Sequence, residues 1–169
     1  MGFAKAFFLS LVAFISINFL FVILSSLINN TLDTVFSVLE SAPLMILYYL
    51  FGSITVVPSE SILIMVDFDV DTLISPLGYL LAPLIAAILS GRLGENKGQA
   101  IGGWLLTAVI SAGAIIIGVF LSGTIESILG GVYGTTSQTT ILINVAISLF
   151  INFVGFGFFA LLVSKTEYY

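Results

Sequence analysis

The chain of 169 residues contains no cysteine and no histidine. Without thiolates or imidazoles it cannot build the common zinc, haem or iron–sulfur ligand sets, a disulfide, or a nucleophile activated by histidine. These absences exclude intramembrane metalloproteases with a His-Glu-x-x-His motif, serine proteases with a histidine base and histidine-type phosphatases. We therefore expect a protein that is not an enzyme, with no catalytic residues, no bound metal and no cofactor.

Charged residues are also scarce, at 8% of the chain, whereas 59% of the residues are hydrophobic. A soluble domain of this size would leave most of its apolar surface in water. Four basic residues against nine acidic ones offer no surface for a nucleic acid. The composition predicts an all-α integral membrane protein whose partners are the lipid bilayer and other membrane protein subunits.

Four apolar stretches are long enough to cross a hydrocarbon core of about 30 Å, because a helix rises about 1.5 Å per residue. They are Ala6 to Ile28, Leu73 to Gly91, Ala100 to Leu121 and Ile141 to Val163. The first is interpreted as an uncleaved signal anchor, since it is longer than the apolar core of a cleaved signal peptide. The second contains Pro76 and Pro83, which predict a kink. Residues 1–169 are expected to form a single polytopic membrane domain with four transmembrane helices.

Residues 29–72 are predicted to form an insert on the outer face of the membrane. Acidic and hydroxyl side chains recur at helical spacing over 33–42, which indicates a helix lying on the membrane surface and ending before Pro43. The segments 53–57 and 62–70, separated by a Pro-Ser-Glu-Ser turn, predict a short β-hairpin. Alternatively, Val35 to Val57 crosses the membrane as a fifth span, with Glu40 near one end.

The basic residues predict the orientation, because lysine and arginine near span ends favour the cytoplasmic side. Arg92 and Lys97 share one short loop and Lys165 follows the last span, whereas Glu60 lies in a segment without basic residues. We therefore expect a multi-pass protein of the cell membrane with its C-terminus in the cytoplasm. Four spans also place Lys5 on that side, while five spans place it outside.

Three carboxylates alternate along the predicted outer segment, at Asp67, Asp69 and Asp71. The spacing resembles the start of a calcium loop, but Thr72 stands where the EF-hand turn requires glycine, and Gly78 where it requires glutamate. We interpret the three residues as a solvated acidic face that contacts a partner subunit. Weak Ca²⁺ binding is the alternative.

Small residues repeat at four-residue spacing at Gly94, Gly98 and Gly102. Such spacing lets two membrane helices approach closely, and it predicts helix packing. A phosphate-binding loop is not indicated, because the G-x-x-x-x-G-K-[ST] order is absent.

One face of the last predicted span is polar, because Asn144, Ser148 and Asn152 follow one another at steps of four. Amides inside a membrane need hydrogen-bonding partners, so this face must meet protein or water. We predict an interhelical hydrogen-bonding face, with a solute path as the alternative.

Two hypotheses for function follow, because packing patterns are plentiful and catalytic groups are missing. The leading one is a non-catalytic small multi-pass membrane protein that acts as an accessory or scaffold subunit of a larger membrane protein complex. The alternative is a small-solute transporter or an integral substrate-binding subunit of an importer, with the polar face of the last span and Trp104 lining its pocket.

Overall fold

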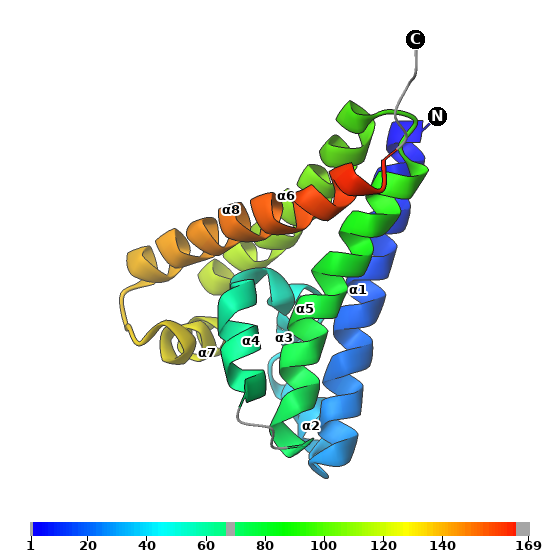
Figure 1. Ribbon diagram of the computed structural model, residues 1–169. Helices are drawn as coiled ribbons and strands as arrows, with labels where there is room; N and C mark the ends of the chain where they lie inside the picture. Colours follow the sequence, from blue (N-terminus) through cyan, green and yellow to red (C-terminus); the bar gives the residue numbers. More distant parts are fainter. Residues whose placement is uncertain (1, 67–69, 165–169) are drawn as a thin grey trace.

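The computed structural model describes residues 2–66 and 70–164 of the chain (Figure 1). Every regular element in this part is a helix, and no strand occurs in it. The elements are α1 (Gly2–Ile28), α2 (Leu32–Ser41), α3 (Met45–Phe51), the 3-10 turn η1 (Gly52–Thr55), α4 (Pro58–Val66), α5 (Val70–Leu93), α6 (Lys97–Leu121), α7 (Gly123–Tyr133) and α8 (Gln138–Leu162). The predicted all-α class is confirmed.

Four of these helices are long and apolar enough to cross a membrane: α1, residues Leu73–Leu93 of α5, α6 and α8. They coincide with the four predicted spans, because an uninterrupted apolar run in lipid must satisfy its backbone hydrogen bonds within a helix. Pro76 and Pro83 both lie inside α5. The four long apolar helices are compatible with a multi-pass membrane protein.

The four long helices form two pairs (Figure 1). Helices α1 and α5 run side by side, and α6 with α8 crosses them at a steep angle, so that the pairs converge near the N-terminus and diverge toward the opposite end. Hydroxyl groups connect the helices within and between the pairs. Ser25 Oγ of α1 lies 2.9 Å from Ser75 Oγ of α5, and Thr107 Oγ1 of α6 lies 3.1 Å from Ser10 Oγ of α1. The shorter elements α3, η1, α4 and α7 lie between the diverging pairs.

Helix α2 occupies the place where the sequence predicts a surface helix, and it ends before Pro43 as expected. Val35 is buried, while Asp33, Ser37 and Glu40 are exposed. A continuous span over residues 35–57 is not formed, since the chain divides there into α2, α3 and η1. The position of α2 at a membrane surface stays a prediction.

The predicted β-hairpin is wrong. Residues 53–55 belong to η1, residues 62–66 belong to α4, and α5 begins at Val70. A two-stranded hairpin leaves its outward N–H and C=O groups unpaired, which is costly in an apolar setting, whereas a helix satisfies its own backbone. That cost outweighs the preference of β-branched residues for strands.

The segment from Met45 to Val66 instead enters and leaves from the same end of the molecule. Residues Met45–Thr55 and Pro58–Val66 are together long and apolar enough for one span, but they meet at an angle of 88°, as in a broken span or a re-entrant loop. In Figure 1 the chain rises from α2 through α3 and returns through α4 to the lower end, where α5 begins. We call residues 45–66 the re-entrant hairpin and Gly52–Val56 its tip.

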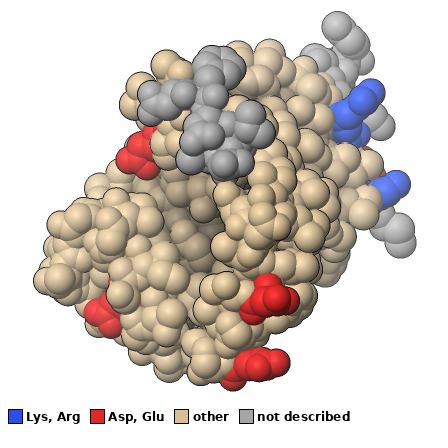
Figure 2. All heavy atoms as spheres, turned by 90° about the horizontal axis from the view of Figure 1, so that it is seen from below, with Lys and Arg blue, Asp and Glu red and all other residues tan. Residues whose placement is uncertain are grey.

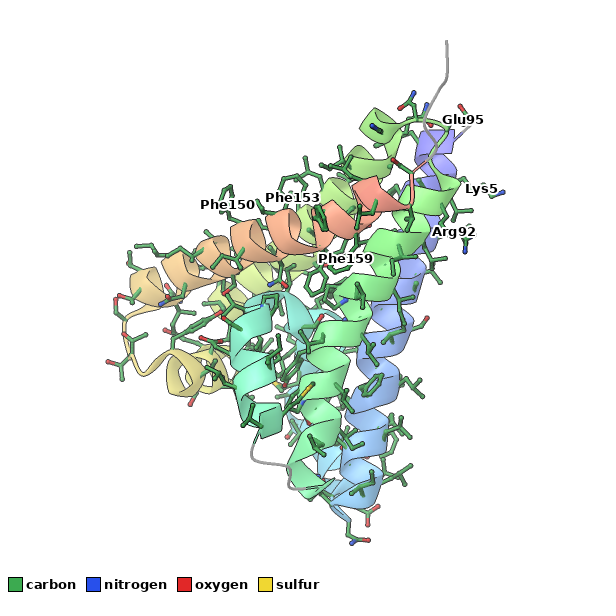
Figure 3. The ribbon with its side chains drawn as sticks, viewed as in Figure 1. Lys5, Arg92, Glu95, Phe150, Phe153 and Phe159 are labelled. Atoms are coloured by element: carbon green, nitrogen blue, oxygen red, sulfur yellow. The ribbon has the colours of Figure 1, made fainter. Side chains whose placement is uncertain are left out.

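Charges of opposite sign gather at opposite ends of the described chain. Lys5, Arg92 and Glu95 lie together beside the N-terminus (Figure 3), at what we call the basic end. Figure 2 looks onto the other end, where acidic side chains are spread over the surface. The described acids away from the basic end are Asp33, Glu40, Glu60 and Glu126, and we call their side the acidic end. Which end faces the cytoplasm stays a prediction, and Lys165 lies outside the described residues.

Helices α6 and α8 cross over an aromatic core. The Trp104 side chain is fully buried, its ring centroid lies 6.2 Å from that of Phe156, and its Nε1 donates a hydrogen bond to the Phe153 carbonyl at 3.2 Å. The outer face of α8 carries Phe150, which is 67% exposed and points away from the bundle (Figure 3). Such a face suits contact with lipid.

Candidate functional site at the re-entrant hairpin

The tip of the re-entrant hairpin is fully buried although its backbone is not α-helical. Ser53, Ile54 and Thr55 have no exposed surface. Backbone N–H and C=O groups at such a place need partners from outside the segment, because neither water nor a regular helix supplies them. Side chains of α1, α7 and α8 provide those partners.

Asn152 of α8 binds the tip through two carbonyl groups. Its Nδ2 donates to the carbonyl oxygens of Ile54 at 3.3 Å and Val56 at 3.0 Å, and also to the Ser148 carbonyl of its own helix at 2.9 Å. The side chain is fully buried. Since Asn152 precedes Leu162 by ten residues, it lies about 15 Å inside the end of α8.

Asn18 of α1 binds the tip from the other side. Its Oδ1 accepts a hydrogen bond from the Ser53 backbone N–H at 3.2 Å, and its Nδ2 donates to the Phe14 carbonyl at 2.9 Å. Asn18 precedes Ile28 by ten residues, which again corresponds to about 15 Å of helix. The tip therefore reaches the middle of both α1 and α8.

Tyr133 at the end of α7 completes the attachment. Its hydroxyl donates to the Thr55 carbonyl at 2.7 Å, and Ser148 lies close enough to interact with it. Three separate helices thus hold one short segment of irregular backbone.

Three buried oxygen atoms in the described chain have no hydrogen-bonding partner: Asn152 Oδ1, Ser53 Oγ and Ser61 Oγ. Two of them belong to residues of the tip or to its partner on α8. Buried polar atoms in native proteins are nearly always bonded to protein or to ordered water. The hairpin therefore has hydrogen-bonding capacity that the protein itself does not use.

A cavity of about 380 Å³ lies directly against the tip, and we call it the vestibule. Its walls come from the hairpin, α5 and α7, and the lining residues are Tyr48, Val56, Glu60, Leu63, Ile64, Tyr79 and Val132. Val56 belongs to both the tip and the lining, so the tip forms part of the vestibule wall. Figure 2 shows that the acidic end is hollowed.

Two tyrosines line both the vestibule and a second, smaller space. Tyr48 and Tyr79 lie close enough to interact, and both residues also line an inner recess of about 30 Å³ together with Asn18 and Ser75. The recess is large enough for a water molecule and is lined by polar groups. The tyrosine pair therefore stands between the vestibule and the polar side chains that hold the tip.

Glu60 is an exposed carboxylate of the re-entrant hairpin. It lies in the first turn of α4, which begins at Pro58, and it is close enough to Tyr133 to interact with it electrostatically. Six residues separate it from Val66, so it lies about 9 Å along α4 from the acidic end. Carboxylates inside a membrane face protein interiors or water-filled cavities. Glu60 faces the vestibule.

The predicted polar face of α8 is divided by the structure. Ser148 and Asn152 are buried and contact the tip or its partner Tyr133. Asn144 is half-buried, and its Nδ2 donates to the Thr140 carbonyl of its own helix at 3.0 Å. Trp104, expected in a pocket if the chain transports a solute, lies instead in the core between α6 and α8.

The three glycines of the predicted packing repeat do not share one neighbour. A Cβ atom on Gly94 would lie 2.7 Å from the Ala100 backbone nitrogen, so this glycine permits the tight turn between α5 and α6. On Gly102 it would lie 3.2 Å from the Phe3 ring of α1, and on Gly98 it would meet Asn96 Oδ1 at 3.4 Å. Of the three, Gly102 makes the contact between helices that the repeat predicts.

The acidic triplet cannot be placed at the vestibule. Asp67 and Asp69 lie outside the described residues, and for Asp71 the structure describes a backbone position in α5. Another depression, of about 750 Å³, is lined mainly by glycines and threonines of α7 and the segment that follows it, and it contains Glu126. Four of its nine lining residues are glycines, and none is aromatic, whereas the vestibule has two tyrosines.

No protein-family model, no curated protein and no solved structure matches this chain. The vestibule residues were not identified from the sequence, where Glu60 counted only as one of the outer acids. Two features of the sequence mark the region around the vestibule. Asn18 is a single amide inside an apolar run, and Pro58 with Glu60 interrupts a stretch that is apolar on both sides.

Proposed function

We propose that this chain binds a small solute in the vestibule, as a small-solute transporter or as an integral substrate-binding subunit of an importer. The observation that carries the proposal is a cavity of about 380 Å³ set among the helices, with a carboxylate and two tyrosines in its walls. Binding sites for small molecules typically enclose about 300 to 1,000 Å³ of mostly apolar surface with a few polar groups.

The attachment of the tip supports a site that is reached from one side of the membrane. Asn18, Tyr133 and Asn152 bind the tip at the middle of the bundle, so the vestibule ends there. Interrupted helices near the centre of the bilayer are the elements that form substrate sites in many transporters. The hairpin of this chain has that form, with α3 and α4 as its two short helices.

The accessory-subunit hypothesis ranks second. It was based on missing catalytic groups and on plentiful packing patterns. In the described chain the buried amides at Asn18 and Asn152 bind the tip, through Oδ1 of Asn18 and Nδ2 of Asn152, so these two groups are used within the chain rather than offered to a partner. That use favours a self-contained fold around the vestibule.

The proposal predicts that the vestibule holds water. Because the chain lacks native cysteine, Leu63→Cys and Phe150→Cys each introduce a single thiol, at positions that are 68% and 67% exposed. Leu63 lines the vestibule and Phe150 is on the outer face of α8. We expect a charged thiol reagent to modify position 63 roughly 100-fold faster than position 150, because a thiol in lipid does not ionise.

The measurement is the labelling rate in proteoliposomes, with Ser137→Cys in the loop before α8 as a fully accessible reference. Val132→Cys, on the opposite wall of the vestibule, should behave like Leu63→Cys. Equal and slow labelling at positions 63, 132 and 150 would mean that the space is dry or filled with lipid, and the proposed function would fail.

A further inference from the structure

We infer that the ligand of the vestibule is a small organic cation, such as a primary amine or a quaternary ammonium compound, held by Glu60 and by the rings of Tyr48 and Tyr79. This inference rests on the proposed function and adds to it the chemical class of the solute. It follows from the charge of the vestibule, from the chemistry of its walls and from the number of oxygen atoms that it offers.

The charge distribution favours a cation. Glu60 is the one charged residue among the seven that line the vestibule. Around it, the described charged residues of α2, α4 and α7 are all acidic, whereas Lys5 and Arg92 lie at the basic end, and Lys97 begins α6 two residues after Glu95. A cavity lined by charge of one sign and surrounded by apolar walls concentrates the opposite ion.

The helix N-terminus beside the vestibule does not counter this preference. The first turn of α4 carries a partial positive charge that attracts anions. Glu60 lies in that same turn and supplies the negative charge itself. An anionic solute would meet the Glu60 carboxylate before it reached the helix end.

The walls favour an organic cation over a metal ion. Calcium requires six to eight oxygen ligands, and the vestibule offers one carboxylate and the two tyrosine hydroxyls. No group of three acidic side chains suited to a metal occurs in the described residues. Tyrosine rings attract ammonium groups through their faces, and Val56, Leu63, Ile64 and Val132 provide apolar contact for the carbon atoms of such a ligand.

The test compares two thiol reagents of opposite charge at Val132→Cys. One carries a trimethylammonium group and the other a sulfonate group, and each rate is divided by the rate at Ser137→Cys to remove intrinsic reactivity. We expect the cationic reagent to be favoured at position 132 by about tenfold, as a unit charge a few ångströms away requires. Tetramethylammonium should slow the labelling, and neutral tert-butanol should not.

Two substitutions assign the effect to Glu60. Glu60→Gln keeps the size of the side chain and should abolish both the charge preference and the protection, while Glu60→Asp should keep them in part. The matched control is Glu126→Gln, an acid of α7 outside the vestibule lining, which should leave both unchanged. The Glu60→Gln protein must still be labelled at position 132, which shows that the vestibule is intact.

The outcomes separate this inference from the proposed function. Rapid labelling of position 132 without charge preference would show that the solute is not an organic cation. Protection by tert-butanol or sodium ions as strong as that by tetramethylammonium would show the same. In both cases the proposed binding of a small solute in the vestibule would remain. If Glu60→Gln keeps the preference, Glu60 is not the anchor and the inference is wrong. If position 132 is not labelled at all, the proposed function itself fails.

Discussion

Replacing Asn152 with leucine is expected to lower the free energy of unfolding by about 3 kcal/mol, because buried acceptors that lose their donor cost about 1–3 kcal/mol each. The Ile54 and Val56 carbonyls would both lose the donor that Asn152 supplies. Leucine is similar in size and apolar, so insertion of α8 into a membrane is preserved. Reversible unfolding in mild detergent, followed by circular dichroism, measures the change.

Asn144→Leu is the matched control for this substitution. Asn144 is half-buried, and its Nδ2 donates to the Thr140 carbonyl of its own helix. The helix keeps its backbone hydrogen bonds without this contact. Its replacement is expected to change the free energy of unfolding by less than about 0.5 kcal/mol, as for other peripheral positions. Equal losses in the two variants would show that the tip does not depend on Asn152.

Replacing Gly91 with alanine is expected to destabilise the protein by about 2 kcal/mol or more. A Cβ atom at this position of α5 would collide with the backbone carbonyl oxygen of Ala160 in α8 and would approach Val163 Cγ2 to 2.6 Å. A backbone atom of a packed helix cannot move aside as the end of a side chain can, so α5 and α8 would have to separate. The melting temperature in detergent reports the effect.

Gly155→Ala provides the comparison on α8, because no atom lies within 4 Å of a Cβ built there. Alanine at an open helical position is neutral or stabilising by up to about 1 kcal/mol, owing to its higher helix propensity. A loss of stability at position 155 as large as that at position 91 would mean that the close contact between α5 and α8 is not the cause.

The long helices could be predicted from the sequence because each is determined locally. An apolar run of more than 20 residues has few ways to satisfy its backbone other than a membrane-spanning helix. The bounds of α6 and α8 differ from the predicted spans by three residues at their N-terminal ends and by at most one at their C-terminal ends. At the N-terminal ends, Asn96 and Ser137 cap the helices with side-chain oxygens. The polar N-terminal residues in these first turns were assigned to loops.

The re-entrant hairpin could not be predicted, because its stability depends on residues far away in the sequence. The segment 53–57 has the β-branched composition of a strand, and its irregular backbone is satisfied by Asn18, Tyr133 and Asn152. Asn152 was recognised from the sequence as an amide that needs a partner, but the partner was unknown. The vestibule forms only when this hairpin is in place, so the interruption at Pro58 and Glu60 did not reveal it by itself, and Tyr48 gave no signal.

The proposed vestibule requires that the re-entrant hairpin enters and leaves the membrane on the same side. Single cysteines at Leu44 and Val66 precede and end the hairpin, and an impermeant reagent applied to sealed, oriented vesicles reports the side of each. We expect both cysteines to be labelled when the reagent is applied to the face on which Ser137→Cys is labelled. When the reagent is applied to the face on which Glu95→Cys is labelled, neither should react. Labelling of positions 44 and 66 from opposite faces would show that the segment is a broken span, and it would contradict the fold and the vestibule together.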